Sequence, residues 1–298
     1  MECREYYGPT TLLQVHETLG SLRGPVLFFA GGTDILVEAL DTERYADACV
    51  VDLFGVRELR ELSVTPEELW IGAGVTHAEL ASSDEVRKAA PLLALAAGSV
   101  GSPQIRNHAT LGGNVANASP AADTLPALVV LGARAELESP RGSRSLPVED
   151  LIAGPYRNTL QEREFIRRIC VPCQKDGSRS RFFKLGRRRA LAISRISVAG
   201  MARQDEDGTV EEIRIALGAV FPRPLVFPDV QAGLVGRIPD RRDLERLAGA
   251  LADKIPEVSG IRSSTAYKVP VSRHILLRVL RDLVWIPGEE DAPDLMIS

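Results

Sequence analysis

The stretch VLFFAGGTD at residues 26–34 decides how the chain begins to fold. Its first five residues are apolar and predict a short buried strand, which Gly31 and Gly32 end. Thr33 and Asp34 then begin a predicted helix that runs through residue 40. Glycines let a backbone approach a diphosphate, and the first free N–H groups of a helix point toward such an anion. Because a carboxylate would repel phosphate, we expect Asp34 to cap backbone N–H groups. The alternative is an ordinary strand-to-helix turn.

A second glycine pair occurs about eighty positions further along, in TLGGN at residues 110–114. It lies within residues 98–121, which are rich in glycine and asparagine and predict a long irregular segment. Loops longer than about 12–15 residues are uncommon and usually functional or disordered. The apolar residues spaced along this segment indicate that it is ordered and functional. Two such loops could hold a long diphosphate ligand from both sides, although the second could also merely turn the chain.

A helix is predicted to follow, with Ser119 as its cap, Pro120 at its first position and its end at residue 131. Asp123 would lie one turn inside this helix. There it could meet a hydroxyl-bearing ligand or remain a solvated helix residue.

Several other motifs argue against competing chemistries. The stretch GAGVTH at residues 72–77 begins like a dinucleotide-binding fingerprint but has His77 in place of the third glycine, so a Rossmann domain is rejected. Cys170 and Cys173 have redox-type spacing, but they are expected at a strand end, where no helix start lowers a thiol pKa. The four histidines lack metal-ligand spacing, and the G-x-S-x-G motif of serine hydrolases is absent. We therefore predict no metal ligands and no acyl-transfer site.

Composition places the chain among soluble globular proteins of two or three domains. It has 298 residues, 45% hydrophobic and 26% charged, with a net charge of −4. No basic block suggests nucleic-acid binding, and the longest apolar run, residues 125–131, is too short to span a membrane. The N-terminus lacks the pattern of a secretory signal, and four cysteines are too few for a disulfide framework. A cytoplasmic location is therefore expected.

A polar, basic stretch at residues 174–181 predicts a domain boundary. Before it, residues 134–138 and 143–146 predict a hairpin. Beyond it, residues 182–189 predict a strand entering a basic turn, from which Lys184 or an arginine could stabilise negative charge on a reduced ring system. A second hairpin is expected from residues 196–202 and 210–220 around the turn at 205–208. Helices are expected at about residues 240–254 and 273–285, followed by a loose acidic tail from residue 287.

Taken together, these motifs resemble the FAD-binding (medium) subunit of the molybdenum hydroxylases, a family that includes bacterial xanthine dehydrogenases and aerobic carbon monoxide dehydrogenases. The resemblance rests on an ordered set of motifs that covers residues 5–285: AGGTD (30–34), VGSPQIRNHATLGGN (100–114), NASPAAD (117–123), GPYRNTL (154–160), FKLGRRRALAIS (183–194) and RSSTAY (262–267). Lys268 departs from the family, which commonly has arginine at this position.

The resemblance implies an α+β fold with FAD as the cofactor. A two-subdomain FAD-binding domain at residues 1–175, divided into about 1–55 and 56–175, would precede a smaller C-terminal domain of antiparallel sheet plus helices at 178–286 and an acidic tail at 287–298. The diphosphate would lie against residues 30–34 and 110–114, with Asp123 in contact with FAD and Ile166 and Lys184 beside the flavin. The implied cofactor-binding residues are Phe29, Ala30, Gly31, Gly32, Thr33, Asp34, Ile35, Thr110, Leu111, Gly112, Gly113, Asn114, Asp123, Ile166 and Lys184.

The function implied by the resemblance is electron transfer within a multi-subunit oxidoreductase. Electrons would come from a molybdenum cofactor through two [2Fe–2S] clusters on partner chains, an iron–sulfur subunit and a molybdenum-cofactor subunit, and would leave from the flavin to NAD or another acceptor. The flavin itself would be the catalytic group, and a purine is the favoured substrate of the whole complex. One alternative is a self-sufficient flavoprotein oxidase, for which only His77 and His108 are nearby candidates for a base. Another is a non-catalytic module that stores FAD or assists assembly.

Overall fold

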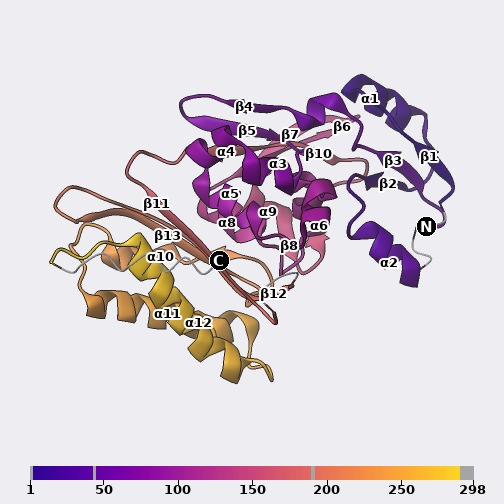
Figure 1. Cartoon of the computed structure of the whole chain (residues 1–298). Helices are drawn as coiled ribbons and strands as arrows, with labels where there is room; N and C mark the ends of the chain where they lie inside the picture. Colours follow the sequence, from indigo (N-terminus) through magenta and orange to yellow (C-terminus); the bar gives the residue numbers. More distant parts are fainter. Residues whose placement is uncertain (1–2, 43–44, 189–191, 289–298) are drawn as a thin grey trace.

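The computed structural model describes residues 3–42, 45–188 and 192–288 and consists of three consecutive parts (Figure 1). The N-terminal part lies at one end, the central part follows, and the C-terminal sheet with its two long helices lies at the other end. Arg189 of the expected basic turn lies outside the described residues, as does the expected acidic tail from residue 289 onward.

The N-terminal part is built on a small parallel sheet whose strands lie in the order β1-β3-β2. Its core is formed by apolar residues of α1 and β3, joined by Phe165 from the central part. Strand β2 is half-buried rather than buried as expected, because residues 27–29 also line a cleft on that side. The elements are β1 (Glu5–Tyr7), α1 (Leu12–Ser21), β2 (Val26–Phe29), α2 (Ile35–Asp41) and β3 (Cys49–Asp52).

The central part combines a five-stranded antiparallel sheet, in the order β4-β5-β10-β6-β7, with short helices. The expected hairpin is confirmed as β6 and β7. The strands are β4 (Leu62–Val64), β5 (Glu68–Gly72), β6 (Arg134–Ser139), β7 (Gly142–Pro147) and β10 (Phe165–Pro172), with a small separate pair, β8 (Ile152–Gly154) and β9 (Arg157–Asn158). The helices are η1 (Arg57–Arg60), α3 (His77–Ser82), α4 (Asp84–Ala89), α5 (Pro91–Gly98), α6 (Pro103–His108), α7 (Leu111–Asn117), α8 (Thr124–Val130) and α9 (Val148–Leu151).

Two expectations for this part are wrong. Residues 98–121 are not irregular, because Ser102 and Thr110 cap the short helices α6 and α7 by accepting hydrogen bonds from backbone N–H groups three residues on. Ser119 does not cap the next helix. Residues 119–122 instead form a turn closed by the Ala122 N–H donating to the Ser119 carbonyl, and α8 begins only after Asp123.

The C-terminal part is an antiparallel sheet covered on both faces. Alternate residues of β12 point in opposite directions, so Val198 packs against α11 and α12 while Ala199 and Met201 pack into the core of the central part. Gly200 lets α12 approach the sheet, since a Cβ there would lie 2.7 Å from a Leu283 methyl group. This continuous packing joins the C-terminal part to the central part.

The strands of this part lie in the order β11-β12-β13-β14, and the expected hairpin is confirmed as β12 and β13. Helix α11 continues past its expected end at residue 254, and α12 begins before its expected start at residue 273, since the two helices run through Pro256 and Pro270. The elements are β11 (Arg179–Gly186), β12 (Ser194–Gln204), β13 (Val210–Gly218), β14 (Leu225–Val226), α10 (Pro228–Gln231), η2 (Ala232–Leu234), α11 (Arg241–Ser259) and α12 (Thr265–Leu283). The observed architecture is therefore the α+β fold that the sequence predicted.

Candidate cofactor-binding cleft

A cleft of about 700 Å³ lies between the N-terminal part and the central part. This volume falls within the range of roughly 300–1,000 Å³ that is typical of ligand and cofactor sites. Most of the residues implied by the resemblance line it: Phe29, Ala30, Gly31, Gly32, Thr33, Asp34, Ile35, Thr110, Gly112, Gly113, Asn114 and Ile166. The fold thus brings both glycine pairs to one site, although they lie far apart in the sequence.

The first glycine pair forms a tight backbone turn at the end of β2. Gly32 has a φ of +69°, which favours glycine, and a Cβ on Gly31 would overlap the carbonyl oxygen of His108. In the part of the chain that the structure describes, the backbone N–H groups of residues 31–34 have no hydrogen-bond acceptor. Consecutive N–H groups in such a turn form a concave site for an anion.

The second glycine pair contributes shape rather than free donors. The Gly113 N–H donates to Thr110 Oγ1 at 3.1 Å, and the Gly112 N–H donates to the Ala73 carbonyl at 2.9 Å. A Cβ on Gly112 would lie 2.5 Å from that of Ala73, so the glycine allows α7 to pack directly on the turn after β5. The N–H groups at the start of α7 are therefore already bonded within the protein.

A direct hydrogen bond joins the two glycine regions. Asn117 Nδ2 donates to Asp34 Oδ1 at 2.9 Å. Asp34 stands at the N-cap of α2, but its side chain makes no capping hydrogen bond, so the expectation that it caps backbone N–H groups is wrong. Its carboxylate instead faces α7 and ties the N-terminal part to the central part across the cleft.

Three implied residues do not line the cleft. Leu111 is fully buried in the core of the central part. Lys184 Nζ lies 2.6 Å from Asp123 Oδ2 and donates to the Ser99 carbonyl at 2.9 Å, while Ser194 Oγ donates to Asp123 Oδ1 at 2.5 Å. Burial raises the pKa of Asp123, and Lys184 opposes this effect. The cluster fastens β11 and β12 to the central part next to α8.

Several lining residues were missed by the sequence analysis. Ala73 and Gly74 belong to the GAGVTH stretch, whose strand β5 lies in an antiparallel sheet, so the rejection of a Rossmann unit there is confirmed. The glycines of that stretch were nevertheless a usable signal of a close backbone approach. Tyr156, Asn158 and Glu164 also line the cleft. Tyr156 and Asn158 lie in the GPYRNTL stretch, which supported the resemblance without being assigned a binding residue, whereas no sequence pattern marks Glu164.

Neither histidine considered as a base for an oxidase lines the cleft. His77 is fully buried, and burial followed by the charge of Arg106 lowers its pKa to about 4. His108 is exposed and packs beside the Phe54 ring at a centroid distance of 6.3 Å. The base required by a self-sufficient oxidase is therefore not supplied by either side chain.

The two closely spaced cysteines have raised pKa values. Burial, followed by a hydrogen bond with Glu68, raises the pKa of Cys170 to about 12, and burial also raises the pKa of Cys173. Both thiols thus remain protonated at neutral pH, unlike a reactive redox pair. Among residues 3–42, 45–188 and 192–288, no group of three or more His, Cys, Asp or Glu side chains could hold a metal ion. Within the same ranges, no helix combines the length and the apolar character needed to cross a bilayer.

Comparison with known proteins defines the class of protein. Residues 2–174 match the family described as "FAD binding domain in molybdopterin dehydrogenase", and residues 181–283 match "CO dehydrogenase flavoprotein C-terminal domain". The chain therefore belongs to this family of dehydrogenase flavoproteins, which are oxidoreductase components with FAD as cofactor.

Individual relatives are similar over nearly their whole length. The chain is 30% identical to the nicotinate dehydrogenase FAD-subunit of Eubacterium barkeri, with 94% of this chain and 96% of the relative covered. It is 29% identical to the putative xanthine dehydrogenase FAD-binding subunit of Escherichia coli, with 87% and 89% covered. A solved structure of carbon monoxide dehydrogenase from Hydrogenophaga pseudoflava superposes with a TM-score of 0.86 at 27% identity, covering 95% of this chain and 97% of that chain.

Proposed function

We propose that this chain is the electron-transfer subunit of a multi-subunit molybdenum hydroxylase and that its FAD binds in the cleft described above. Electrons would arrive from an iron–sulfur partner, supplied in turn by a molybdenum-cofactor subunit, and would leave to NAD or another acceptor. The relatives named above come from a nicotinate dehydrogenase and a putative xanthine dehydrogenase at similar identities, so a purine substrate for the complex rests on the resemblance of the sequence motifs alone. A cytoplasmic location and the division at residues 1–175 and 178–286 are part of the same proposal.

One observation carries the placement of FAD in the cleft. The backbone N–H groups of residues 31–34 face no acceptor within the described ranges, yet they belong to a turn that lines the cleft. Gly32 is buried and its neighbours Gly31 and Thr33 are half-buried. Backbone donors shielded from water are nearly always paired, and an anion such as a diphosphate satisfies them. The glycine at position 32 is also the residue type that the φ of +69° favours. The residues present therefore fit a diphosphate-containing cofactor.

Bound FAD would supply the redox chemistry, while the protein supplies position and electrostatics. The turn at residues 31–34 binds the diphosphate, and the Asp34–Asn117 hydrogen bond holds the two sides of the cleft together. Phe29 and Ile166 provide apolar wall that excludes water from the bound ring system. Leu111, Asp123 and Lys184 act indirectly, since they pack or fasten the elements from which the wall is built.

The placement of FAD is tested with cleft variants of the purified full chain. Thr33→Glu places a carboxylate in the anion-binding turn, where the native hydroxyl makes only a 3.4 Å contact to Asp34. We expect FAD affinity, measured by quenching of flavin fluorescence, to fall at least about tenfold, because like charges repel at this range. Gly233→Ala is the matched control, since a Cβ at that position meets no atom within 4 Å. Wild-type protein that takes up no FAD, or unchanged affinity in Thr33→Glu, would contradict the placement.

The electron-transfer role requires a separate experiment. The chain should co-purify with iron–sulfur and molybdenum-containing partners when it is isolated from its source, and substrate added to that complex should bleach the flavin absorbance. A flavin-loaded chain that turns over an organic substrate without partners would support the oxidase alternative instead.

A further inference from the structure

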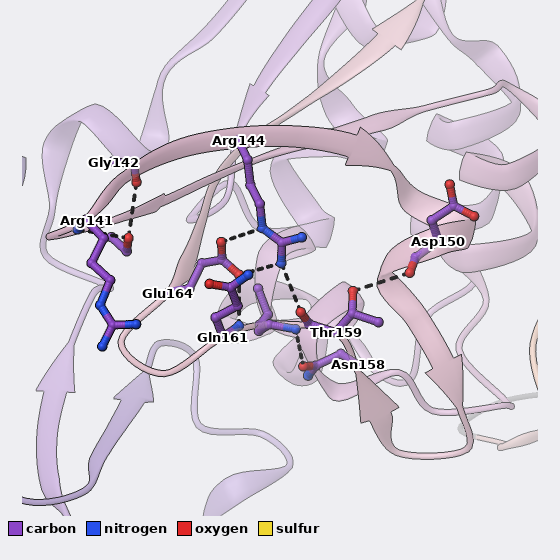
Figure 2. A network of polar contacts seen from close by, with 10 residues as sticks. Arg141, Gly142, Arg144, Asp150, Asn158, Thr159, Gln161 and Glu164 are labelled. Atoms are coloured by element: carbon purple, nitrogen blue, oxygen red, sulfur yellow. Dashed lines mark hydrogen bonds and ion pairs between the residues drawn. The ribbon is translucent and has the colours of Figure 1, made fainter.

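One wall of the cleft depends on a buried carboxylate. Glu164 lines the cleft and is only 6% exposed. Arg144, on the edge strand β7, holds both of its oxygens: Arg144 Nε donates to Oε1 at 2.7 Å and Nη2 donates to Oε2 at 2.8 Å (Figure 2). The Gln161 N–H donates to Oε2 at 2.9 Å. This bidentate geometry gives a stronger arginine–carboxylate interaction than a single hydrogen bond does.

The same guanidinium also fixes the segment that leads to Glu164. Arg144 Nη2 donates to the Thr159 carbonyl at 2.9 Å, as Figure 2 shows. At the other end of this segment, Asn158 Nδ2 donates to the Ala116 carbonyl of α7 at 2.6 Å. Residues 158–164 are therefore tied both to the sheet and to the helix that carries the second glycine pair. Asn158, Leu160 and Glu164 of this segment all line the cleft.

Arg144 itself lies outside the cleft lining, so it can act on a ligand only through these neighbours. The hydrogen bonds from Arg144 are the main cause that lowers the pKa of Glu164, which keeps the carboxylate charged although it is buried. If the arginine is lost, a buried charge is left without its partner, which is costly. The carboxylate would then take up a proton or turn away, and the segment would lose its attachment to β7.

We propose that Arg144 is a positioning residue for FAD, which it serves by holding Glu164 and residues 158–164 in place as one wall of the cofactor cleft. This inference rests on the proposed function, because it takes the cleft to be the FAD site. Ile166 lies two residues beyond Glu164 at the start of β10, so the same attachment sets where the apolar end of the wall lies.

The chain offers a matched control pair on the same sheet. Arg168 Nε and Nη2 contact the two oxygens of Glu136 at 2.5 and 3.2 Å. The arginines are similarly exposed, at 40% for Arg168 and 37% for Arg144. Neither Arg168 nor Glu136 lines the cleft. The partner Glu136 is 27% exposed and Glu164 is 6% exposed. A general effect of losing an arginine–glutamate pair of this sheet should therefore also appear in Arg168→Met, whereas an effect on the cleft should not.

The test compares wild type, Arg144→Met, Arg144→Lys and Arg168→Met as full chains, with two measurements on each. FAD affinity is measured by fluorescence quenching, and the environment of the bound ring is measured by visible circular dichroism. We expect Arg144→Met to weaken FAD binding at least about tenfold and to change the visible spectrum, since it removes two hydrogen bonds to the Glu164 carboxylate and one to the Thr159 carbonyl. Arg144→Lys should restore part of both, and Arg168→Met should change neither.

The outcomes that contradict this inference can be told apart from those that contradict the proposed function. Wild type that binds no FAD would remove the proposed function and this inference with it. Wild type that binds FAD while Arg144→Met binds it equally well would remove this inference alone, as would an equal loss in Arg168→Met. If Arg144→Met does not fold, the double variant Arg144→Met with Glu164→Gln can replace it. The double variant leaves no unpaired buried charge, but it still lacks the hydrogen bond from Arg144 to the Thr159 carbonyl. That double variant should bind FAD more weakly than wild type, and equal affinity would overturn the proposal.

Discussion

Acid is expected to destabilise the folded chain through His77, the first residue of α3. Its side chain is fully buried, and neither ring nitrogen has a hydrogen-bond partner among the described residues. Burial, reinforced by the charge of Arg106, lowers the pKa of His77 from 6.5 to about 4. Lowering the pH from neutrality to about pH 5 should therefore charge His77 in the unfolded chain, whereas His77→Met keeps a similar volume but does not titrate.

The sign and size of the effect follow from the two pKa values. Between the folded and unfolded pKa values the unfolded chain binds more protons, so stability is complete above the unfolded pKa of 6.5 and is lost as the pH falls toward 4. The free energy of unfolding should lose about 2 kcal/mol between about pH 7.5 and about pH 5. The full loss, reached below the folded pKa, is about 3 kcal/mol.

The assay is urea unfolding of FAD-saturated wild type and His77→Met at both pH values. Other titrating groups and the binding of FAD contribute to both proteins, so the difference between their pH dependences isolates His77. We expect His77→Met to be at least as stable as wild type near neutrality, because no hydrogen bond is lost, and to resist acid better. Equal pH dependences in the two proteins would mean that His77 is not held neutral in the folded chain.

Three further outcomes are expected. Lys184→Met should lower the free energy of unfolding by about 3 kcal/mol in urea, because it leaves Asp123 buried without its partner, and adding Asp123→Asn should recover part of the loss; no change would mean that Asp123 is neutral in the fold. Asn117→Ala should weaken FAD binding severalfold with little change in thermal stability, since it removes the hydrogen bond to Asp34 across the cleft; equal flavin affinity would contradict that link. FAD at about a hundredfold excess over its dissociation constant should stabilise the chain by about 2.7 kcal/mol, visible as a higher Tm than in the flavin-free protein; an unchanged Tm would argue against binding to the folded state.

Periodic segments made much of the fold predictable. The alternation of apolar residues in β13 and the glycine-containing turn before it marked the C-terminal hairpin, and the apolar stripe of α12 marked a helix. The capping box at the start of α3 is another local feature, in which the Thr76 hydroxyl accepts from the Glu79 N–H and the Glu79 carboxylate accepts from the Thr76 N–H. Such features depend on residues close in sequence, so they can be recognised without knowing what packs against them.

Helix N-caps are harder to recognise in a segment that is rich in glycine. Residues 98–121 contain enough glycine and asparagine to suggest irregular structure, yet Ser102 and Thr110 each nucleate a short helix. Ser119 carried an equally good local signal and was wrong, because the Ala219 N–H donates to the Pro120 carbonyl and holds residues 119–122 against β13 as a turn. Tertiary hydrogen bonds thus decided between two local signals of similar strength.

The glycine pairs show why a site can be located from sequence before its chemistry can be assigned. Gly31 packs against the His108 carbonyl, and Gly112 packs against Ala73. A side chain at either position would clash, so backbone packing requires glycine in both places whether or not a ligand is present. What separates the two is the state of the neighbouring N–H groups, which are bonded internally in α7 but lack acceptors at residues 31–34 within the described chain. Residue identity alone carries no information about which donors are used, because that depends on partners tens of positions away. We therefore propose the anion-binding role for the first pair, whereas the second pair lets α7 pack against the turn after β5, and Asn117 of this helix donates to Asp34.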